Sequence, residues 1–344
     1  MRRPKHSTVV ALVACVILSG SAVSAAAAPC PGNPDALGVS RVITVSAKDY
    51  SRIGRMQYRT SLPLGPREVV LTFDDGPLPP YTDRVLAILA RECVQATFFL
   101  VGRMVAANPQ AARQIYAAGH TIGNHSQNHV IHFDQISEAR AEHEIDAGMT
   151  TISAALGGAR ALAPFFRIPG LGRTRQVEGY LQAKSLVVWS ADTVADDWRR
   201  INSTQVMQRA LRRLEARGKG VLLLHDIQPR MVLMLPTLLA ELKRRNFHIV
   251  HVVPEDRPAL APILTASLPA PKQAWPRLAA AGANAVMPAA APRILLAGTD
   301  AAPEEKTPLP PRRKIQPRRK HVTVASAGAL AVTPVVRSSL DMSY

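Results

Sequence analysis

The sequence predicts an α/β fold in which a mainly parallel sheet closes, or nearly closes, into a barrel. Between Glu68 and Val253, short apolar runs alternate with segments whose apolar residues recur at helical spacing. This alternation is typical of βα units. The chain has 344 residues, 47% of them hydrophobic, so it can bury a substantial core. After Pro254 the composition changes to alanine, proline and basic residues without a sustained period, which predicts a disordered tail.

Seven strands and six helices are expected in the regular region. The strands are expected at 69–73, 96–101, 120–123, 164–168, 186–190, 220–225 and 247–252. The helices are expected at 83–91, 109–118, 137–156, 175–184, 203–217 and 231–245. The first strand lacks strict alternation of apolar and polar residues, so both of its faces should be covered, as in parallel sheets. Seven such repeats indicate the barrel.

The N-terminus has the order of a secretory signal peptide, which we place at residues 1–28. A basic start is followed by an apolar run at 8–18 and then by small residues. The run is too short for a membrane-spanning helix, so none is expected after signal cleavage. Cleavage is expected after Ala26 or Ala27, and lipidation at Cys15 ranks second. The sequence therefore predicts export to the periplasm, the extracellular space or the cell envelope.

Residues 29–65 show little periodicity and are expected to form a lead-in that packs loosely on the domain at 66–255. Export implies an oxidising compartment in which two cysteines remain, Cys30 and Cys93. Pairing of the two is one alternative. The position of Cys93 between a helix and an apolar strand favours the other, a small buried hydrophobic residue.

The net charge of +17 is shared between the helices and the tail at 256–344. The tail holds two concentrated basic blocks, at 311–314 and 317–320. An exported basic segment first meets anionic envelope polymers and membrane surfaces, so a specific nucleic acid is not expected. Two roles are open for this tail, and the sequence favours neither. The tail could bind an anionic envelope polymer, or it could increase solubility without a partner.

Two adjacent carboxylates end the first expected strand. Asp74 and Asp75 follow its apolar run and precede a Gly76-Pro77 turn that stops strand pairing. The carboxyl ends of parallel strands are where α/β enzymes place their chemistry. Neighbouring side chains on an extended chain point in different directions. One carboxylate can therefore bind a metal while the other transfers protons.

A histidine cluster follows the third expected strand. His125 and His129 are four residues apart, which would place both rings on one side of a helical turn. With Asp75 they make a set of two histidines and one carboxylate, and three protein ligands with an open position are typical of a catalytic metal site. Zinc is the first expectation, although cobalt, nickel or ferrous iron suit the same set.

Three further expected strands end in polar residues. One brings Arg167 and a glycine turn at Gly170, and the next is followed by an acidic segment that ends at Trp198. A very apolar strand ends at His225. Because the carboxyl ends of parallel strands meet at one edge of the sheet, we expect these groups to lie near the two aspartates.

Five segments, taken in order, resemble the polysaccharide deacetylase family, the NodB homology domain of carbohydrate esterase family four. They lie at 72–77, 96–99, 123–129, 167–169 and 223–226. The resemblance runs from about Arg67 to Val253 and implies a distorted (β/α)7 barrel. It also implies removal of N-acetyl, or sometimes O-acetyl, groups from sugar polymers with a divalent metal.

The resemblance implies a role for individual residues in and near these segments. Asp74 is similar to the catalytic base and His225 to the general acid, while the metal ligands correspond to Asp75, His125 and His129. Arg167 resembles the arginine that orients the base, and Asp197 resembles the acid that partners the histidine. The acetyl-pocket walls correspond to Trp198 and Leu223, and a backbone N–H near Gly170 is suited to the oxyanion.

The sequence departs from the family pattern in two places. Asp192 and Asp197 are five residues apart before the tryptophan, where relatives have three, so Asp196 is an alternative partner for His225. Gly170 stands where many relatives have an aromatic residue. The first departure affects the acid of the reaction, and the second affects contacts with substrate.

Together these observations predict a secreted, metal-dependent hydrolase of carbon–nitrogen bonds other than peptide bonds. Its expected substrate is an acetylated polysaccharide containing N-acetylglucosamine, peptidoglycan first and chitin-like polymers second. One alternative keeps the fold but makes the protein an O-acetyl esterase or another amidase. The alternative from a different class is a non-catalytic envelope-binding module.

Overall fold

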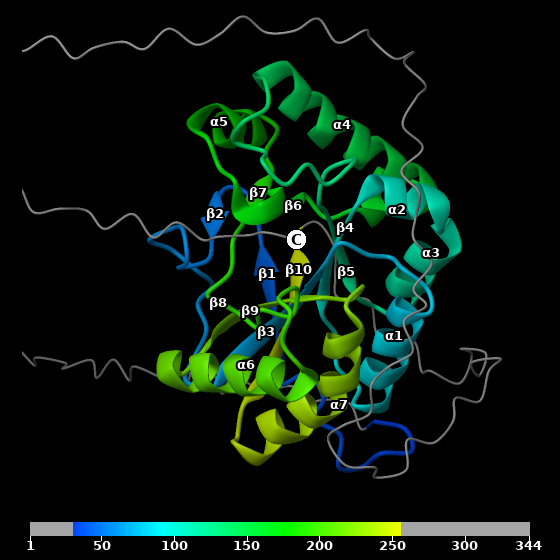
Figure 1. Cartoon of the computed structure of the whole chain (residues 1–344), viewed down its shortest axis with the longest axis vertical. Coiled ribbons are helices and arrows are strands. Elements are labelled where there is room, and N and C mark those ends of the chain that lie inside the picture. The colour runs from blue at the N-terminus through cyan, green and yellow to red at the C-terminus, as the bar shows by residue number, and fades with distance from the viewer. Residues whose placement is uncertain (1–29, 256–344) are drawn as a thin grey trace, which may run out of the picture. The chain divides into compact units, whose positions relative to one another are not determined.

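A computed structural model of the chain describes residues 30–255 (Figure 1). The expected signal peptide and the expected basic tail lie outside these residues. Within 30–255, no helix combines the length and the apolar character that a membrane span requires.

The described residues alternate strands and helices in the expected order. The strands are β1 (Arg41–Val45), β2 (Arg52–Ile53), β3 (Glu68–Asp74), β4 (Thr97–Leu100), β5 (Thr121–Asn124), β6 (Phe165–Arg167), β7 (Val187–Trp189), β8 (Thr193–Val194), β9 (Gly220–His225) and β10 (His248–Pro254). The helices are α1 (Tyr81–Arg91), α2 (Gly102–Ala107), α3 (Pro109–Ala117), α4 (Glu138–Ala155), α5 (Arg175–Ala183), α6 (Ser203–Arg217) and α7 (Pro229–Arg244), with short 3-10 turns η1 (Ala159–Ala161) and η2 (Pro169–Leu171). All seven expected strands and six expected helices are confirmed, whereas β1, β2, β8 and α2 were not anticipated.

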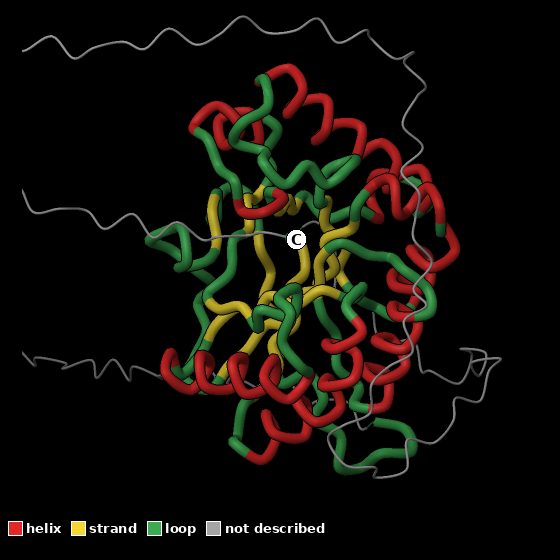
Figure 2. The backbone as a smooth tube through the Cα atoms, viewed as in Figure 1, coloured by secondary structure: helices red, strands yellow, loops and turns green. Residues whose placement is uncertain are grey.

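The strands form one parallel sheet that curves around a central axis, with helices outside it (Figure 2). β3 pairs with both β4 and β9, and the sheet continues through β5, β6 and β7 to β2 on one side and to β8 on the other. The last strand departs from a regular barrel. β10 pairs with β3 only at His248 and Ile249, and then pairs with β1 from Val250 onward.

Both faces of the sheet are buried, as the unbroken apolar run of β3 predicted. Leu71 and Phe73 belong to a large cluster with apolar residues of α1, α6 and α7. Val70, which points to the other face, packs in a second cluster with residues of β1 and β10. Strands β1 and β10 therefore help to fill the inner side of the curved sheet.

The expectation that residues 29–65 pack loosely was wrong. Ile43, Val45 and Ile53 are buried, and their strands pair with β10 and β7. Two strands of five and two residues carry too few apolar positions to show a period, so sequence reasoning missed them. Cys93 also differs from the favoured expectation, because it forms a disulfide with Cys30.

Candidate active site

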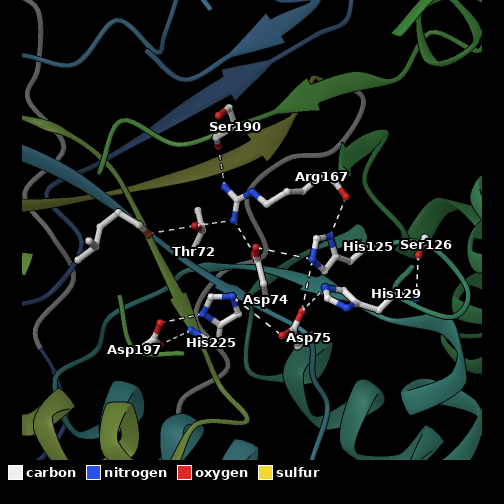
Figure 3. Close-up of polar contacts among 11 residues, drawn as sticks. Thr72, Asp74, Asp75, His125, Ser126, His129, Arg167, Ser190, Asp197 and His225 are labelled. Carbon is white, nitrogen blue, oxygen red and sulfur yellow. Dashed lines mark hydrogen bonds and ion pairs between the residues drawn. The ribbon is translucent and has the colours of Figure 1, made fainter. Parts of the chain in front are cut away.

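Carboxylates, histidines and an arginine from four strands meet at the carboxyl end of the sheet (Figure 3). β3 ends in Asp74, the first histidine of the cluster follows β5, β6 ends in Arg167, and β9 ends in His225. The neighbouring strands are parallel and in register, so their ends deliver these side chains to one place. Most of the cluster is buried.

Arg167 fixes the position of Asp74. Its guanidinium lies 2.5 Å from Asp74 Oδ1, and the same nitrogen, Nη1, donates to Thr72 Oγ1 at 2.9 Å. Its Nη2 donates to the carbonyl of Ser190 at 2.9 Å, and the group stacks on the ring of Phe99. Burial lowers the pKa of Arg167, which is fully inaccessible, and Asp74 opposes that shift. The short contact with Asp74 therefore favours the charged form of the buried arginine.

Asp75 turns away from Asp74 and toward the histidines. Its backbone φ is 78°, a left-handed conformation that aspartate tolerates better than most residues. Its Oδ1 lies 3.4 Å from His125 Nε2 and 3.1 Å from His129 Nε2. Burial would raise the pKa of Asp75, but the neighbouring rings of His225, His129 and His125 hold it well below its usual range.

The two histidines lie on a loop and not on the expected helical turn. Ser126 and His129 have φ values of 67° and 54°, and the backbone N–H of His129 donates to Ser126 Oγ at 3.0 Å. These left-handed residues bend the chain so that the rings of His125 and His129 lie 4.9 Å apart. His125 Nδ1 lies 2.7 Å from the carbonyl of Arg167, so its Nε2 is the nitrogen that faces Asp75.

This donor set fits a metal ion. The ligand atoms that Asp75, His125 and His129 offer all lie within 4.8 Å of one another. Asp75 Oδ1 is buried and has no hydrogen-bond partner among the described residues, as expected for an oxygen that serves as a ligand. The carbonyl at His125 Nδ1 is the outer partner that metal-binding histidines usually have. Two imidazole nitrogens and one carboxylate oxygen suit zinc and related divalent metals.

Helix α4 holds the histidine loop, through a residue that sequence reasoning missed. Glu144 is 3% exposed, and its two carboxylate oxygens accept from the backbone N–H and the side-chain amide of Asn128 at 2.7 and 2.9 Å. Its backbone carbonyl accepts from Gln127 N. A Cβ at Gly148, one turn further along the helix, would lie 2.8 Å from the Ser126 carbonyl carbon. The loop and the helix therefore pack at close range.

His225 is paired with an acid on the other side of the cluster. Its Nδ1 lies 2.8 Å from Asp197 Oδ1, and its backbone N–H donates to Asp197 Oδ2 at 2.7 Å. Burial would lower the pKa of His225, but Asp197 and Asp75 raise it to about 10. Asp196, the alternative partner, instead binds two arginines of α6, Arg209 and Arg213.

The residues expected to contact substrate lie beside His225 or after Arg167. Leu223 is buried two positions before His225 on β9, so the two side chains share a face. The ring of Trp198 meets that of His225 edge-on at 5.3 Å. Gly170 lies in η2, where its φ of 59° favours glycine. All the site residues singled out in the sequence thus lie at one end of the sheet.

Comparison with known proteins gives consistent matches. The sequence profile of the polysaccharide deacetylase family matches residues 62–188. A peptidoglycan-N-acetylglucosamine deacetylase of Bacillus cereus is 30% identical over 206 residues, which are 56% of this chain and 89% of that protein. A chitooligosaccharide deacetylase of Bradyrhizobium is 32% identical over 207 residues, or 56% of this chain and 91% of that one.

A solved structure extends the comparison. The peptidoglycan deacetylase Bd3279 of Bdellovibrio bacteriovorus aligns with a TM-score of 0.56 and 30% identity, covering 63% of this chain and 59% of that chain. The chain thus spans more than half the length of that protein and most of the two relatives above. On these matches, the chain belongs to the polysaccharide deacetylase family of carbohydrate-acting hydrolases.

Proposed function

We propose that the protein is an exported zinc-dependent deacetylase that hydrolyses the N-acetyl groups of an N-acetylglucosamine polymer, with peptidoglycan as the leading substrate. One observation carries the proposal. The candidate metal triad of Asp75, His125 and His129 lies beside two acid–base pairs, Asp74 with Arg167 and His225 with Asp197. Amide hydrolysis needs a base for water and an acid for the amine, and the two pairs would supply one each next to the triad.

Asp74 is the proposed base. A divalent metal held by the triad would supply positive charge that polarises the amide carbonyl and acidifies water. The carboxylate of Asp74 would accept a proton from the attacking water as the new carbon–oxygen bond forms. Its contact with Arg167 holds the carboxylate in place at the site. A backbone N–H near Gly170 would stabilise the oxyanion.

His225 is the proposed acid. Asp197 accepts a hydrogen bond from Nδ1, which leaves Nε2, the other ring nitrogen, 4.0 Å from Asp75 Oδ2 and available to carry the proton that is transferred. That proton would move to the amine nitrogen as the carbon–nitrogen bond breaks, giving acetate and a free amino sugar. Without an acid here, the tetrahedral species would expel water more readily than amine. Trp198 and Leu223 would flank the methyl group of the acetyl.

The test is acetate release by the mature chain, residues 29–344, from N-acetylglucosamine oligomers and from peptidoglycan, with and without added zinc. We expect zinc-dependent release that falls by roughly 10²–10⁴-fold in Asp74→Asn. O-acetylated sugars are assayed in parallel. Faster release from these would favour the esterase, and release from neither, by folded protein with metal bound, would favour the binding module. Detection of the protein in the cytoplasm alone would contradict export.

A further inference from the structure

A loop from the N-terminal segment packs against segments that carry residues of the candidate site. Residues 54–60 follow β2, and the backbone N–H of Gly54 donates to the carbonyl of Thr60 at 3.0 Å to close the loop. A Cβ at Gly54, whose φ is 112°, would lie 2.6 Å from Ala191 N. Only glycine allows this approach, so the sequence itself specifies that the loop packs against the segment after β7.

Three contacts fix the loop against that segment. Met56 N donates to the carbonyl of Ala191 at 2.9 Å, and Arg55 N donates to Asp192 Oδ1 at 2.8 Å. Asp192 Oδ2 accepts from Ser61 Oγ and from the backbone of β9 at Val221, each at 2.8 Å. The buried carboxylate of Asp192 thus links the N-terminal loop to β9. It binds β9 at Val221, two residues before Leu223.

The loop also contacts the segment that follows β6. Gln57 Nε2 donates to the carbonyl of Leu171 in η2 at 2.7 Å, and Arg173 Nη1 donates to the carbonyl of Gln57 at 2.8 Å. Loop 54–60 therefore bridges the segment that carries Gly170 and the segment that leads to Trp198. Its position is set on both sides by hydrogen bonds to backbone atoms.

The side chain of Met56 completes an apolar cluster at this bridge. It is half-buried and packs with Trp198 against Ala191, Val194 and Leu223. Trp198 contacts the ring of His225, and Leu223 shares its strand face. Methionine has a flexible, polarizable side chain that fills irregular apolar space. The matched family region begins at residue 62, so Met56 precedes it.

We infer that Met56 is a specificity-determining residue that limits the length of the acyl group the site accepts. The inference rests on the proposed function and deepens it. An acetyl methyl directed at Trp198 and Leu223 has Met56 as the third apolar neighbour, and a longer acyl chain would meet the methionine side chain. One methylene in a tight apolar pocket typically changes kcat/KM by roughly 10–200-fold.

The test compares N-acetyl, N-propionyl and N-butyryl derivatives of one glucosamine oligomer, using the mature zinc-loaded enzyme. The wild type should favour acetyl over propionyl by at least ~10-fold. Met56→Ala should raise the propionyl-to-acetyl ratio of kcat/KM by ~10-fold or more, because it removes the obstructing side chain. Met56→Val tests the same point with a smaller loss of packing and should give an intermediate ratio.

Met207→Ala is the matched control, because Met207 is also half-buried but lies on α6 and packs on the large cluster that contains Leu71 and Phe73. It should leave the ratio at the wild-type value. A folded Met56→Ala enzyme with an unchanged ratio would overturn the inference and leave the proposed function standing. So would a wild type that accepts propionyl and acetyl equally. No acyl release by the wild type from any derivative would instead count against the proposed function.

Discussion

The two ends of the sheet use buried histidine in opposite ways. At the carboxyl end, burial would lower the pKa of His225, yet Asp197 and Asp75 raise it to about 10. At the amino end, burial lowers the pKa of His120 to about 3 and that of His251 to about 4. All three side chains are at least nine-tenths inaccessible, so burial alone does not explain the difference.

The partners of the rings decide their charge. His120 Nδ1 accepts from the backbone N–H of Ala96 at 3.2 Å, and His251 Nε2 lies 3.1 Å from Thr121 Oγ1. These are neutral groups, whereas His225 faces carboxylates. A neutral ring is stable beside a hydroxyl or an amide, and a charged ring needs an anion. The carboxyl end therefore favours a charged histidine, and the amino end favours neutral ones.

Removing the carboxylate that faces His225 should have the largest effect on activity. Asp197→Asn should lower kcat by roughly 10²–10⁴-fold, because the ring loses the charge that orients it and favours its protonated form. The pKa of His225 should fall, so the alkaline limb of the pH–rate profile moves to lower pH. Steady-state kinetics over pH 5–10, with circular dichroism to confirm folding, would measure both effects.

Asp196→Asn is the matched control for that variant. Asp196 binds Arg209 and Arg213, and it leaves the contact of Asp197 with His225 in place. Its loss of kcat should be at least ~10-fold smaller, because the acid retains its partner. Equal losses in the two variants would contradict the assignment of Asp197 as that partner.

Breaking the disulfide should affect stability and leave the chemistry intact. Cys30 and Cys93 are 63 residues apart, and Cys93 lies in the loop before β4, at the amino end of the sheet. Loop-closure entropy predicts that the double variant Cys30→Ser, Cys93→Ser loses about 4 kcal/mol of unfolding free energy. Denaturant titration measures this loss. A drop in kcat per folded molecule with an unchanged unfolding free energy would contradict the assignment of this bond at the amino end of the sheet to stability.

The neutral state of buried His120 predicts that acid lowers the free energy of unfolding. His120 binds a proton with a pKa near 6.5 when unfolded and about 3 when folded, so acid favours the unfolded chain. Its contribution to stability is complete above pH 6.5 and is lost progressively down to pH 3. Between pH 7 and pH 4 the loss should be on the order of 3 kcal/mol.

His120→Asn tests this prediction. The amide oxygen of asparagine can still accept from Ala96 N, but it does not titrate. The variant should be less stable at pH 7, because the ring that packs on Phe98 is lost, yet its stability should fall less steeply between pH 7 and pH 4. Urea unfolding at several pH values measures both slopes. Parallel slopes in the variant and the wild type would show that His120 is not the acid-sensitive group.

The carboxyl end was predictable from sequence to a large extent because its chemistry follows strand ends. Apolar runs that stop at Asp74, Arg167 and His225 are visible without a structure, and parallel pairing then brings them together. The local geometry of the histidine segment was not predictable. A spacing of four suggests a helical turn, but the left-handed residues Ser126 and His129 produce the same proximity from a loop.

Contacts that join distant segments were also beyond sequence reasoning. Met56 packs on the cluster that contains Leu223 because β2 pairs with β7, and a two-residue strand has no recognisable pattern. In the sequence, Glu144 is one of several charged residues on an amphipathic helix. Its burial depends on the position of the histidine loop in the folded chain. In both cases the signal lies in the tertiary packing and not in a local motif.

Substitution of Glu144 should have the smallest effect of the changes considered. It also tests whether a buried carboxylate at the carboxyl end matters when it does not contact a reacting group. Glu144 is a buried carboxylate at the carboxyl end that contacts no proposed reacting group, since both oxygens bind Asn128. Outer-shell partners of this kind typically change metal affinity by roughly 10–100-fold. Glu144→Leu should weaken zinc binding by that range, because the loop between His125 and His129 loses its anchor.

Glu144→Gln should weaken zinc binding less, by roughly 10-fold or under, because a glutamine oxygen can accept from Asn128 N while the Asn128 amide rotates to accept from the new N–H. Glu142→Gln, on the same helix, is the control and should bind zinc as the wild type does. Competition with a chelator measures affinity on the apo protein without any assay of activity. If Glu144→Leu folds and binds zinc normally, the histidine loop is positioned without α4, and the carboxylates of this end act only where they contact the reacting groups.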